Sequence, residues 1–178
     1  MVLPAVTIRL EQESDTGAIR SVNLAAFETP SEAALVDALR EQGASIVSLV
    51  AVDADVVVGH ILFSPITVDG QDSQMLGLAP MAVRPERQRQ GIGSALVRAG
   101  LEASRGRGAA AVVVVGHAAF YPRFGFVPAS RLGLRCEYDV PDEVFMALEL
   151  VSGARLEEKF GRAGKAGLVR YHPAFADL

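Results

Sequence analysis

The apolar positions near the N-terminus predict one strand followed by two helices. Thr7–Leu10 has the alternation of a short strand. Ser14-Asp15 is a pair of good helix caps, and the pattern after it predicts a helix that runs to about Phe27. A second helix is expected over Pro30–Gly43, where leucines recur at helical spacing before a terminating glycine. The predicted order is therefore strand, helix, helix.

The next part of the chain is dominated by extended patterns. Ile46–Val52 and Val56–Pro65 are apolar runs, and the turn-prone Asp53-Ala54-Asp55 separates them. Two such runs around a short turn predict a β-hairpin. A further strand, the fourth, is expected over Gln74–Val83.

A strand–helix–strand unit follows, and two closing strands come after it. Gly91–Gly106 has the periodicity of an amphipathic helix of about four turns. Ala110–Val115 is a continuous β-branched run, which is typical of a strand buried on both faces. Phe124–Val127 and Val144–Leu150 are expected to be the closing strands, and the Gly-rich, charged tail from Ser152 is expected to be loosely ordered.

Length and composition favour a single domain. The chain has 178 residues, of which 50% are hydrophobic, enough for one sizeable core. No repeat or linker marks a boundary, so we expect one domain over residues 1–178, with its core in 5–150 and a tail over 151–178. The apolar runs are shorter than the roughly 20 residues that a membrane-spanning helix needs, and Met1–Pro4 lacks the features of a secretory signal. We therefore expect a soluble, cytoplasmic protein with no membrane partner.

Charge and metal-binding residues exclude several function classes. The net charge of −4 argues against a nucleic-acid partner but leaves cationic amine substrates open. Cys136 is the single cysteine, which excludes internal disulfides, and it is expected to be a small buried or half-buried hydrophobe rather than a nucleophile. His60, His117 and His172 are too scattered to predict a metal site.

The segment Val83–Ser94 has the composition of an anion site. It joins a strand to a helix through glycines and basic side chains. The first amides of a helix lack partners within the helix and point outward with the positive end of its dipole, so a pyrophosphate can accept several of them. The dinucleotide fingerprint fails because Leu96 stands where a third glycine is needed, and a Walker loop fails because Gly91 is not followed by lysine. A tight strand-to-helix turn without a ligand is the alternative.

The motifs in this region resemble the GNAT superfamily of acetyl-CoA-dependent N-acetyltransferases. Gln88-Arg89-Gln90-Gly91-Ile92-Gly93 matches the superfamily's phosphate loop, and Met81–Pro85 is similar to the strand end before it. Phe120–Phe126 resembles the segment that carries the superfamily's tyrosine and a closing Gly-Phe. The resemblance is specific over Leu76–Val127. Together with Tyr121–Phe126, Gly59–Ser64 is similar to the bacterial YhbS-like branch.

The resemblance implies a fold and a cosubstrate. The fold would be α/β (α+β), a single domain with a mixed, twisted sheet of about seven strands, helices on both faces and splayed strands four and five. The cosubstrate would be acetyl-CoA, with no metal required. Residues of the fourth strand would pair with the pantetheine arm and the loop would cradle the pyrophosphate; these cofactor-binding residues are Met81, Ala82, Val83, Gln88, Arg89, Gln90, Gly91, Ile92, Gly93 and Ser94.

The resemblance also implies roles at the reacting centre. Tyr121 would protonate the departing thiolate, and its alternative is a tyrosine packed among phenylalanines. Strands four and five carry no glutamate to act as the base, so His117 is the candidate, although it also fits a cofactor contact or a helix start. Glu28 and Glu32 would bind a cationic amine, and solvated helix ends are their alternative. His60 is expected to be structural.

These observations predict an N-acetyltransferase in which a primary amine attacks the thioester of acetyl-CoA directly. The missing strand glutamate keeps a second hypothesis open, a non-catalytic acyl-CoA-binding sensor with the same fold. A protein-partner adaptor rests only on the apolar composition. The acceptor is a small molecule or a peptide amine, which the sequence does not identify further. A homodimer is compatible with a domain of this kind.

Overall fold

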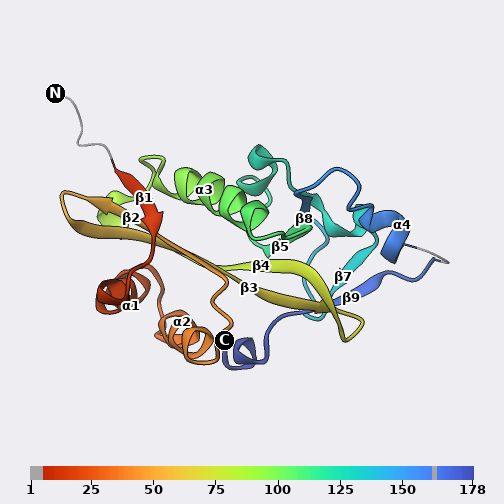
Figure 1. The fold of residues 1–178 in the computed structure, drawn as a ribbon, viewed down its shortest axis with the longest axis horizontal. Helices are drawn as coiled ribbons and strands as arrows, with labels where there is room; N and C mark the ends of the chain where they lie inside the picture. Colours follow the sequence, from red (N-terminus) through yellow and green to blue (C-terminus); the bar gives the residue numbers. More distant parts are fainter. Residues whose placement is uncertain (1–5, 162–163) are drawn as a thin grey trace. The chain divides into compact units, whose positions relative to one another are not determined.

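The N-terminal strand and the two helices after it form where the apolar pattern predicts them (Figure 1). β1 is Thr7–Leu10, α1 is Thr16–Ala26 and α2 is Ser31–Glu41, with a short 3-10 turn, η1 Glu13–Asp15, before α1. The structure, a computed structural model, describes residues 6–161 and 164–178. Asp15 caps this corner, because its carboxylate accepts the backbone N–H of Gln12 at 2.7 Å.

The remaining elements follow in the order shown in Figure 1. The strands are β2 Val47–Asp53, β3 Val56–Val68, β4 Gln71–Val83, β5 Ala111–Val115, β6 Val127–Pro128, β7 Leu134–Cys136, β8 Phe145–Glu149 and β9 Gly167–Arg170. The helices are α3 Ile92–Gly106 and α4 Leu156–Phe160, with 3-10 turns η2 Pro85–Arg87, η3 Tyr121–Phe124, η4 Ala129–Leu132 and η6 Pro173–Asp177.

The sheet is mixed, as the resemblance implied. Within the described residues it has nine strands rather than about seven, and hydrogen-bonded neighbours follow the order β1-β2-β3-β4-β5-β8-β6. β9 pairs with β3 and with β7. The β4–β5 and β7–β9 pairs are parallel, whereas β1–β2, β2–β3 and β5–β8 are antiparallel. Strands and helices together therefore make an α/β fold of the expected class.

Contacts divide the chain into two compact units. Unit 1 contains the described residues up to Phe63 together with Ala79–Ala103 and Pro173–Leu178. Unit 2 contains Ser64–Leu78 and Ser104–His172. Strands β3 and β4 contribute to both units. The single domain expected over residues 1–178 stays a prediction.

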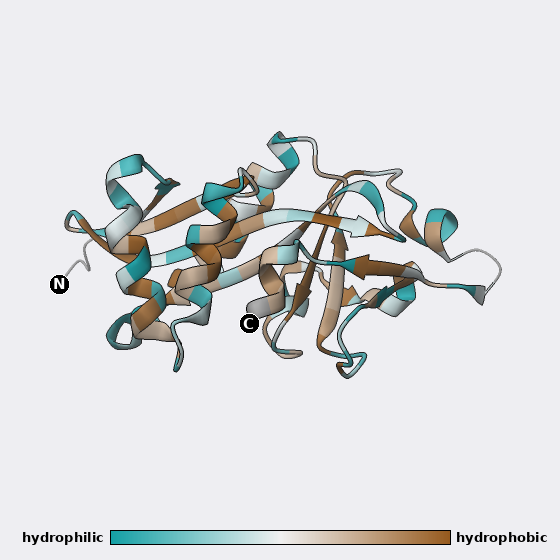
Figure 2. Ribbon diagram, turned by 90° about the horizontal axis from the view of Figure 1, so that it is seen from below, coloured by the Kyte–Doolittle hydropathy of each residue, from teal (hydrophilic) through white to brown (hydrophobic). Residues whose placement is uncertain are grey.

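In unit 1, helices cover both faces of the sheet. Gly59 of β3 faces α3, because a Cβ added to it would lie 3.0 Å from Leu96 Cδ1. The next residue, His60, faces α1, where Asn23 contacts its ring. Successive side chains of a strand point to opposite faces, so α1 and α3 lie on opposite sides of β3. Figure 2 shows hydrophobic stretches along the strands and both hydrophobic and hydrophilic positions on the helices.

In unit 2, β5 is the central strand. Its residues Ala111–Val114 are at most 1% exposed, and β4 and β8 flank it. The parallel pairing of β4 with β5 joins Met75–Gly77 to Ala111–Val113 and ends before either strand ends, as the expected splay requires.

Two expectations for unit 2 are wrong. Phe124–Val127 is not a strand, because Phe124 belongs to the 3-10 turn η3 and β6 begins only at Val127. The tail is not loose over its described residues, because β9 pairs with two strands and η6 follows it. The second error concerns a segment whose order depends on distant partners, β3 and β7, rather than on local pattern. Among the described residues, no helix is long and apolar enough to cross a membrane.

Candidate functional site

The loop between β4 and α3 places backbone N–H groups at the start of a helix. Arg89 and Gly91 have positive φ angles of 60° and 85°, which turn the chain sharply into the helix. The first helical hydrogen bond runs from Ala95 N to Gly91 O at 3.0 Å. Within the described parts of the chain, the amides of residues 91–94 have no hydrogen-bond acceptor. They are therefore available to an anion, as the helix start requires.

Side chains of the same segment hold the loop in shape. Gln88 donates through Nε2 to the carbonyl of Val83 at 3.1 Å, and Gln90 donates to the carbonyl of Glu86 at 3.2 Å. Arg87 is ion-paired with Asp53 and also donates to Gln90 Oε1 at 3.2 Å. These arginine and glutamine side chains brace the backbone, and Arg89, between the two glutamines, is exposed.

The end of β4 and the first helical residue are anchored in the core of unit 1. Ala82 is 2% exposed, and its neighbours Met81 and Val83 are half-buried. Arg84, the next residue, donates its backbone N–H to Val58 O at 2.9 Å. Ile92 is 4% exposed and Ser94 is half-buried. The predicted cofactor-binding residues from 81 to 94 thus form one continuous segment of unit 1 between a buried strand end and a buried helix start.

Tyr121 lies in unit 2, at the start of the 3-10 turn after β5. Its side chain is 6% exposed and its ring makes edge contacts with Phe120 and Phe126, with centroid distances of 5.0 and 5.6 Å. Gly116 allows this position, because a Cβ there would lie 2.3 Å from Tyr121 Cε2. Burial raises the pKa of Tyr121 to about 12, so the phenol stays protonated at neutral pH.

His117 stands between β5 and Tyr121, and its side chain is exposed. Its carbonyl accepts the backbone N–H of Phe120 at 3.0 Å and of Tyr121 at 3.4 Å, so the residue starts the turn that carries the tyrosine. β5 has no carboxylate. β4 begins earlier than expected and therefore includes one, Asp72, which is exposed near the β3–β4 turn. That carboxylate corrects the expectation of an acid-free fourth strand.

Glu28 and Glu32 lie at the connection between α1 and α2. Glu28 is exposed, and Glu32 is half-buried in the first turn of α2. Thr29 Oγ1 donates to Glu32 Oε2 at 3.4 Å, a long hydrogen bond. The two carboxylates share one surface connection of unit 1.

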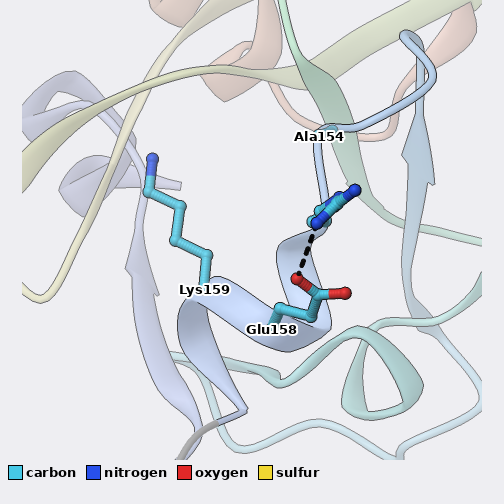
Figure 3. Close-up of a pocket in the computed structure, with 4 residues that line it drawn as sticks. Ala154, Glu158 and Lys159 are labelled. Atoms are coloured by element: carbon cyan, nitrogen blue, oxygen red, sulfur yellow. Dashed lines mark hydrogen bonds and ion pairs between the residues drawn. The ribbon is translucent and has the colours of Figure 1, made fainter.

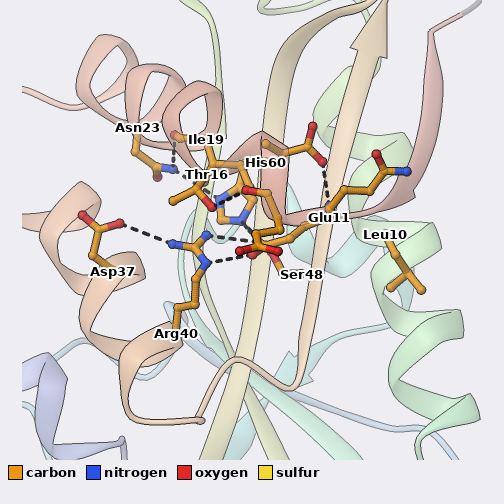
Figure 4. Close-up of polar contacts among 12 residues, drawn as sticks. Leu10, Glu11, Thr16, Ile19, Asn23, Asp37, Arg40, Ser48 and His60 are labelled. Atoms are coloured by element: carbon orange, nitrogen blue, oxygen red, sulfur yellow. Dashed lines mark hydrogen bonds and ion pairs between the residues drawn. The ribbon is translucent and has the colours of Figure 1, made fainter.

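A polar network in unit 1 was missed by the sequence interpretation (Figure 4). Arg40 of α2 donates to both carboxylate oxygens of Glu11, at 2.8 and 3.2 Å. Ser48 of β2 donates to Glu11 and lies 2.9 Å from His60 Nε2. Asn23 of α1 donates to the carbonyl of Ile19 at 3.0 Å and lies 3.2 Å from His60 Nδ1. Only the histidine had been noted, as a structural residue, and its position supports that interpretation.

The network fixes the protonation of its members. Because the Asn23 amide nitrogen can only donate, His60 Nδ1 accepts, and the ring proton sits on Nε2 and is donated to Ser48. Burial lowers the pKa of His60 to about 4, against an opposing effect of Glu11. Burial by itself raises the pKa of Glu11, but hydrogen bonds from Arg40 and Ser48 outweigh it and lower the net pKa. A neutral histidine is therefore linked to an ionised carboxylate.

A small open pocket in unit 2 holds none of the predicted site residues. Ala154, Arg155, Glu158 and Lys159 line it (Figure 3). Arg155 and Glu158 form an ion pair of 3.4 Å with side chains 70% and 63% exposed, which is worth little in water. In the described residues, no group of three or more His, Cys, Asp or Glu side chains is arranged to hold a metal ion.

Comparison with known proteins supports the motif assignment. The model of the Acetyltransferase (GNAT) family matches residues 16–126. The chain is 38% identical to YhbS, an uncharacterized N-acetyltransferase of Escherichia coli, over 169 residues that cover 94% of this chain and 97% of YhbS. It is 40% identical to the E. coli protein YjhQ, also an uncharacterized N-acetyltransferase, over 148 residues that cover 80% of this chain and 82% of YjhQ.

Solved structures show the same similarity in three dimensions. The structure of E. coli YhbS in complex with CoA has a TM-score of 0.87 at 38% identity, over 98% of this chain and 95% of that one. A GNAT family acetyltransferase from Brucella melitensis, in complex with acetyl-CoA, has a TM-score of 0.76 at 36% identity, over 97% of this chain and 99% of that one. Both neighbours match over nearly their whole length.

Proposed function

The chain belongs to the GNAT family of acetyltransferases, and we propose that it transfers the acetyl group of acetyl-CoA to a primary amine. The carrying observation is the β4–α3 loop, whose amides at residues 91–94 have no acceptor in the described chain. The same loop has the GNAT sequence Gln88-Arg89-Gln90-Gly91-Ile92-Gly93. Structural neighbours in complex with CoA and acetyl-CoA support the choice of cosubstrate.

The reaction needs no covalent enzyme intermediate. The lone pair of the neutral amine attacks the thioester carbonyl carbon and forms a C–N bond, while charge develops on the carbonyl oxygen. The C–S bond then breaks, the nitrogen loses one proton to a base, and the departing sulfur gains one proton. The products are the N-acetyl amine and CoA thiol. Backbone N–H groups aimed at the developing oxyanion would supply the electrostatic stabilisation.

The cofactor contacts are assigned to unit 1. In this proposal the amides from Gly91 to Ser94 bind the pyrophosphate, and the exposed Arg89 adds charge at the loop. Backbone groups of Met81, Ala82 and Val83 pair with the amides of the pantetheine arm, as an added strand would. Their support is the left-handed turn at Arg89 and Gly91 and the buried anchors Ala82 and Ile92 on either side.

Tyr121 is the proposed acid that protonates the leaving thiolate. Its support is that burial holds its pKa at about 12, so the phenol carries a proton to donate at neutral pH. His117 is the proposed base, because it is exposed and directly precedes the turn of the tyrosine. Glu28 and Glu32 are proposed to attract the cationic acceptor to unit 1 through charge.

Two measurements test the proposal in sequence. Calorimetry with acetyl-CoA should show binding with a Kd at or below the low millimolar range, and the same titration with Gly91→Ala should be weaker. Detection of free thiol should then show acetyl-CoA consumption in the presence of an amine library. Binding with no thiol release for any amine would favour the acyl-CoA sensor instead, and no binding at all would refute both readings. A homodimer stays a prediction that sedimentation velocity can check.

A further inference from the structure

The β2–β3 hairpin of unit 1 contacts the loop that joins β4 to α3. Asp53 ends β2 and pairs with Val56 of β3. The two residues between them, Ala54 and Asp55, have positive φ angles of 45° and 65°. A two-residue turn of this kind matches the twist of its strands and fixes the register of the hairpin. Asp53 is therefore held at a defined place, although it is 34 positions away from the loop residue that it contacts, Arg87.

The same hairpin is hydrogen-bonded to the residue that follows β4. Arg84 donates its backbone N–H to Val58 O at 2.9 Å and its side-chain Nε to Val57 O at 3.1 Å. The register of the β2–β3 pair shifts at this point, so Val58 has no opposite residue on β2. These contacts fix where the loop leaves the sheet, one residue before η2 begins.

Arg87 links the hairpin to the far end of η2. Its guanidinium is ion-paired with Asp53 through Nη1 and donates from Nε to Gln90 Oε1 at 3.2 Å. Gln90 Nε2 in turn donates to the carbonyl of Glu86 at 3.2 Å, which closes a ring of side-chain contacts over the turn. The side chains of Arg87 and Asp53 are 25% and 11% exposed, so water screens this ion pair less than it screens a fully exposed one.

The carboxylate of Asp53 depends on this ion pair. Its Oδ1 is buried and has no hydrogen-bond partner among the described residues, whereas Oδ2 accepts from Arg87. Taking a carboxylate out of water is costly unless an opposite charge compensates it. The positive charge of Arg87 is therefore compensated within the protein, and its guanidinium is directed to Asp53 and Gln90.

The residue that needs such support is Arg89. Its φ of 60° is unfavourable for a residue with a Cβ and persists only where neighbouring contacts impose it. It lies between Gln88 and Gln90, whose side chains are hydrogen-bonded within the same segment. This left-handed turn directs the chain into α3 and so sets the direction of the amides of residues 91–94. Relaxation at Arg89 would misalign them.

We propose that Asp53 is a positioning residue for acetyl-CoA, which acts through Arg87 to hold the loop in the conformation that binds the pyrophosphate. The inference rests on the role proposed for this loop. Acetyl-CoA carries several negative charges, so Coulomb repulsion by itself predicts that removing the Asp53 carboxylate tightens binding. The positioning role predicts the opposite, because the loss of this side chain changes the backbone conformation of the loop.

Calorimetric titration with acetyl-CoA decides between the two signs. In Asp53→Asn the Kd should rise by about tenfold, because the charge-assisted contact that orients Arg87 is lost. Asp55→Asn is the matched control, since it removes the same charge from an exposed position in the same hairpin turn, and its Kd should stay within about twofold. The rise in Asp53→Asn should persist at about 0.5 M NaCl, where exposed charges are screened.

A double variant tests whether Asp53 acts through Arg87. Arg87→Gln should raise the Kd by a factor similar to that of Asp53→Asn. The variant with both substitutions should bind within about twofold of either single variant, because the two side chains act as one unit. Additive effects, about 100-fold in the double variant, would show that the residues act independently and would overturn the proposal.

The same titrations separate positioning from a loss of folded protein. If Asp53 only stabilised the fold, Asp53→Asn would bind fewer acetyl-CoA molecules per chain, while the Kd of the folded molecules would equal that of the parent. Positioning keeps the stoichiometry and raises the Kd. In thiol-release assays it should raise the KM for acetyl-CoA and largely keep kcat.

Failure of this proposal differs from failure of the proposed function. A Kd in Asp53→Asn that is unchanged or lower overturns the positioning role, and thiol release by the parent protein still supports acetyl transfer. A raised Kd in the variant without thiol release by the parent for any amine supports the positioning role and refutes the transfer. A parent protein that does not bind acetyl-CoA overturns both.

Discussion

The two units handle polar groups in opposite ways. In the described chain, unit 1 leaves the amides of residues 91–94 without acceptors at a helix start, while its half-buried Glu11 and its buried His60 are joined to partners at hydrogen-bond distance. Unit 2 buries the phenol of Tyr121 among aromatic rings and leaves acidic side chains exposed around Tyr138. The backbone N–H groups at the helix start of unit 1 are suited to bind an anion. The buried phenol of unit 2 is suited to hold and release a single proton.

This contrast teaches where each unit is vulnerable. A loop that acts through backbone groups tolerates changes of side chain but not of backbone conformation. A site that acts through one hydroxyl is lost with that hydroxyl, even when the fold is intact. Substitutions should therefore separate binding in unit 1 from turnover in unit 2.

The largest expected effect comes from removing the hydroxyl of Tyr121. Tyr121→Phe keeps the ring contacts, and we expect kcat to fall by about 100-fold or more, because general acid catalysis contributes on that order. The Kd for acetyl-CoA should stay within about twofold in the same preparation. Steady-state thiol release and calorimetry measure the two quantities. An unchanged kcat would remove Tyr121 from the chemistry.

A slightly smaller loss is expected when Tyr121 is displaced rather than altered. Gly116→Ala places a methyl 2.3 Å from Tyr121 Cε2, so the ring must move. Since a shift of about 1 Å at a reacting group can cost on the order of 100-fold, kcat should fall by roughly 10- to 100-fold. Gly106→Ala is the matched control, because no atom lies within 4 Å of its added Cβ. Equal activity of the two variants would show that the tyrosine position is not critical.

The next prediction concerns unit 1, where the buried His60 has hydrogen-bonding partners, and it measures how stability changes with pH. The pKa of His60 is lowered to about 4 from 6.5, so the unfolded chain binds this proton more readily than the folded one. Stability from this group is present above pH 6.5 and is lost as pH falls toward 4; between pH 7 and 5 we expect a loss of about 2 kcal/mol. Urea unfolding at both pH values measures it. His60→Gln, which has no titrating ring, should flatten this part of the pH dependence.

A moderate effect on binding alone is expected from the loop. Gly91 has a φ of 85°, and an added Cβ meets no atom within 4 Å. Gly91→Ala therefore causes backbone strain without a clash, and the Kd for acetyl-CoA should rise by about tenfold while kcat at saturation is largely kept. Gly17→Ala in α1 adds a methyl in open space at an ordinary φ and serves as the control. If kcat in Gly91→Ala fell by a larger factor than the Kd rose, the loop would also act in turnover, and the assignment of binding to unit 1 and of turnover to unit 2 would be wrong.

The smallest effect is expected at the two acceptor-side carboxylates. Glu28→Gln and Glu32→Gln should each raise the acceptor KM by about two- to threefold at low salt, because exposed charges attract weakly through water. The difference from the parent should vanish at about 0.5 M NaCl, where screening is strong. Assays at both salt concentrations check this. A salt-independent change of tenfold or more would indicate direct contact with the acceptor.

The sequence predicted elements and motifs whose structure is local. β1, α1, α2 and α3 form within a few residues of their expected bounds, because apolar periodicity and capping residues act over short spans. The comparisons confirm the GNAT resemblance, which rested on a contiguous loop. A tight turn and a helix start are encoded by neighbouring residues, so one segment carries the whole signal.

Features that depend on distant residues were missed or wrong. Glu11 and Arg40 are 29 positions apart in sequence, and neither looks unusual before α2 brings them together. Tyr171 and Glu137 are 34 positions apart and meet only because β7 pairs with β9. β9 itself has little periodic signal in a glycine-rich context, and its partners supply its order. No local pattern contains that information.

The position of β9 has a consequence for how the protein is made. Its partner on one side, β3, carries Thr67, which pairs with Arg170, and on the other side lies β7. Both partner strands leave the ribosome well before Gly167–Arg170 does. Until then each presents an unpaired edge to its surroundings, and closure of the sheet in unit 2 must wait until synthesis reaches β9. Unit 2 is therefore expected to mature late in translation, and its growing chain should depend on chaperones more than the finished protein does.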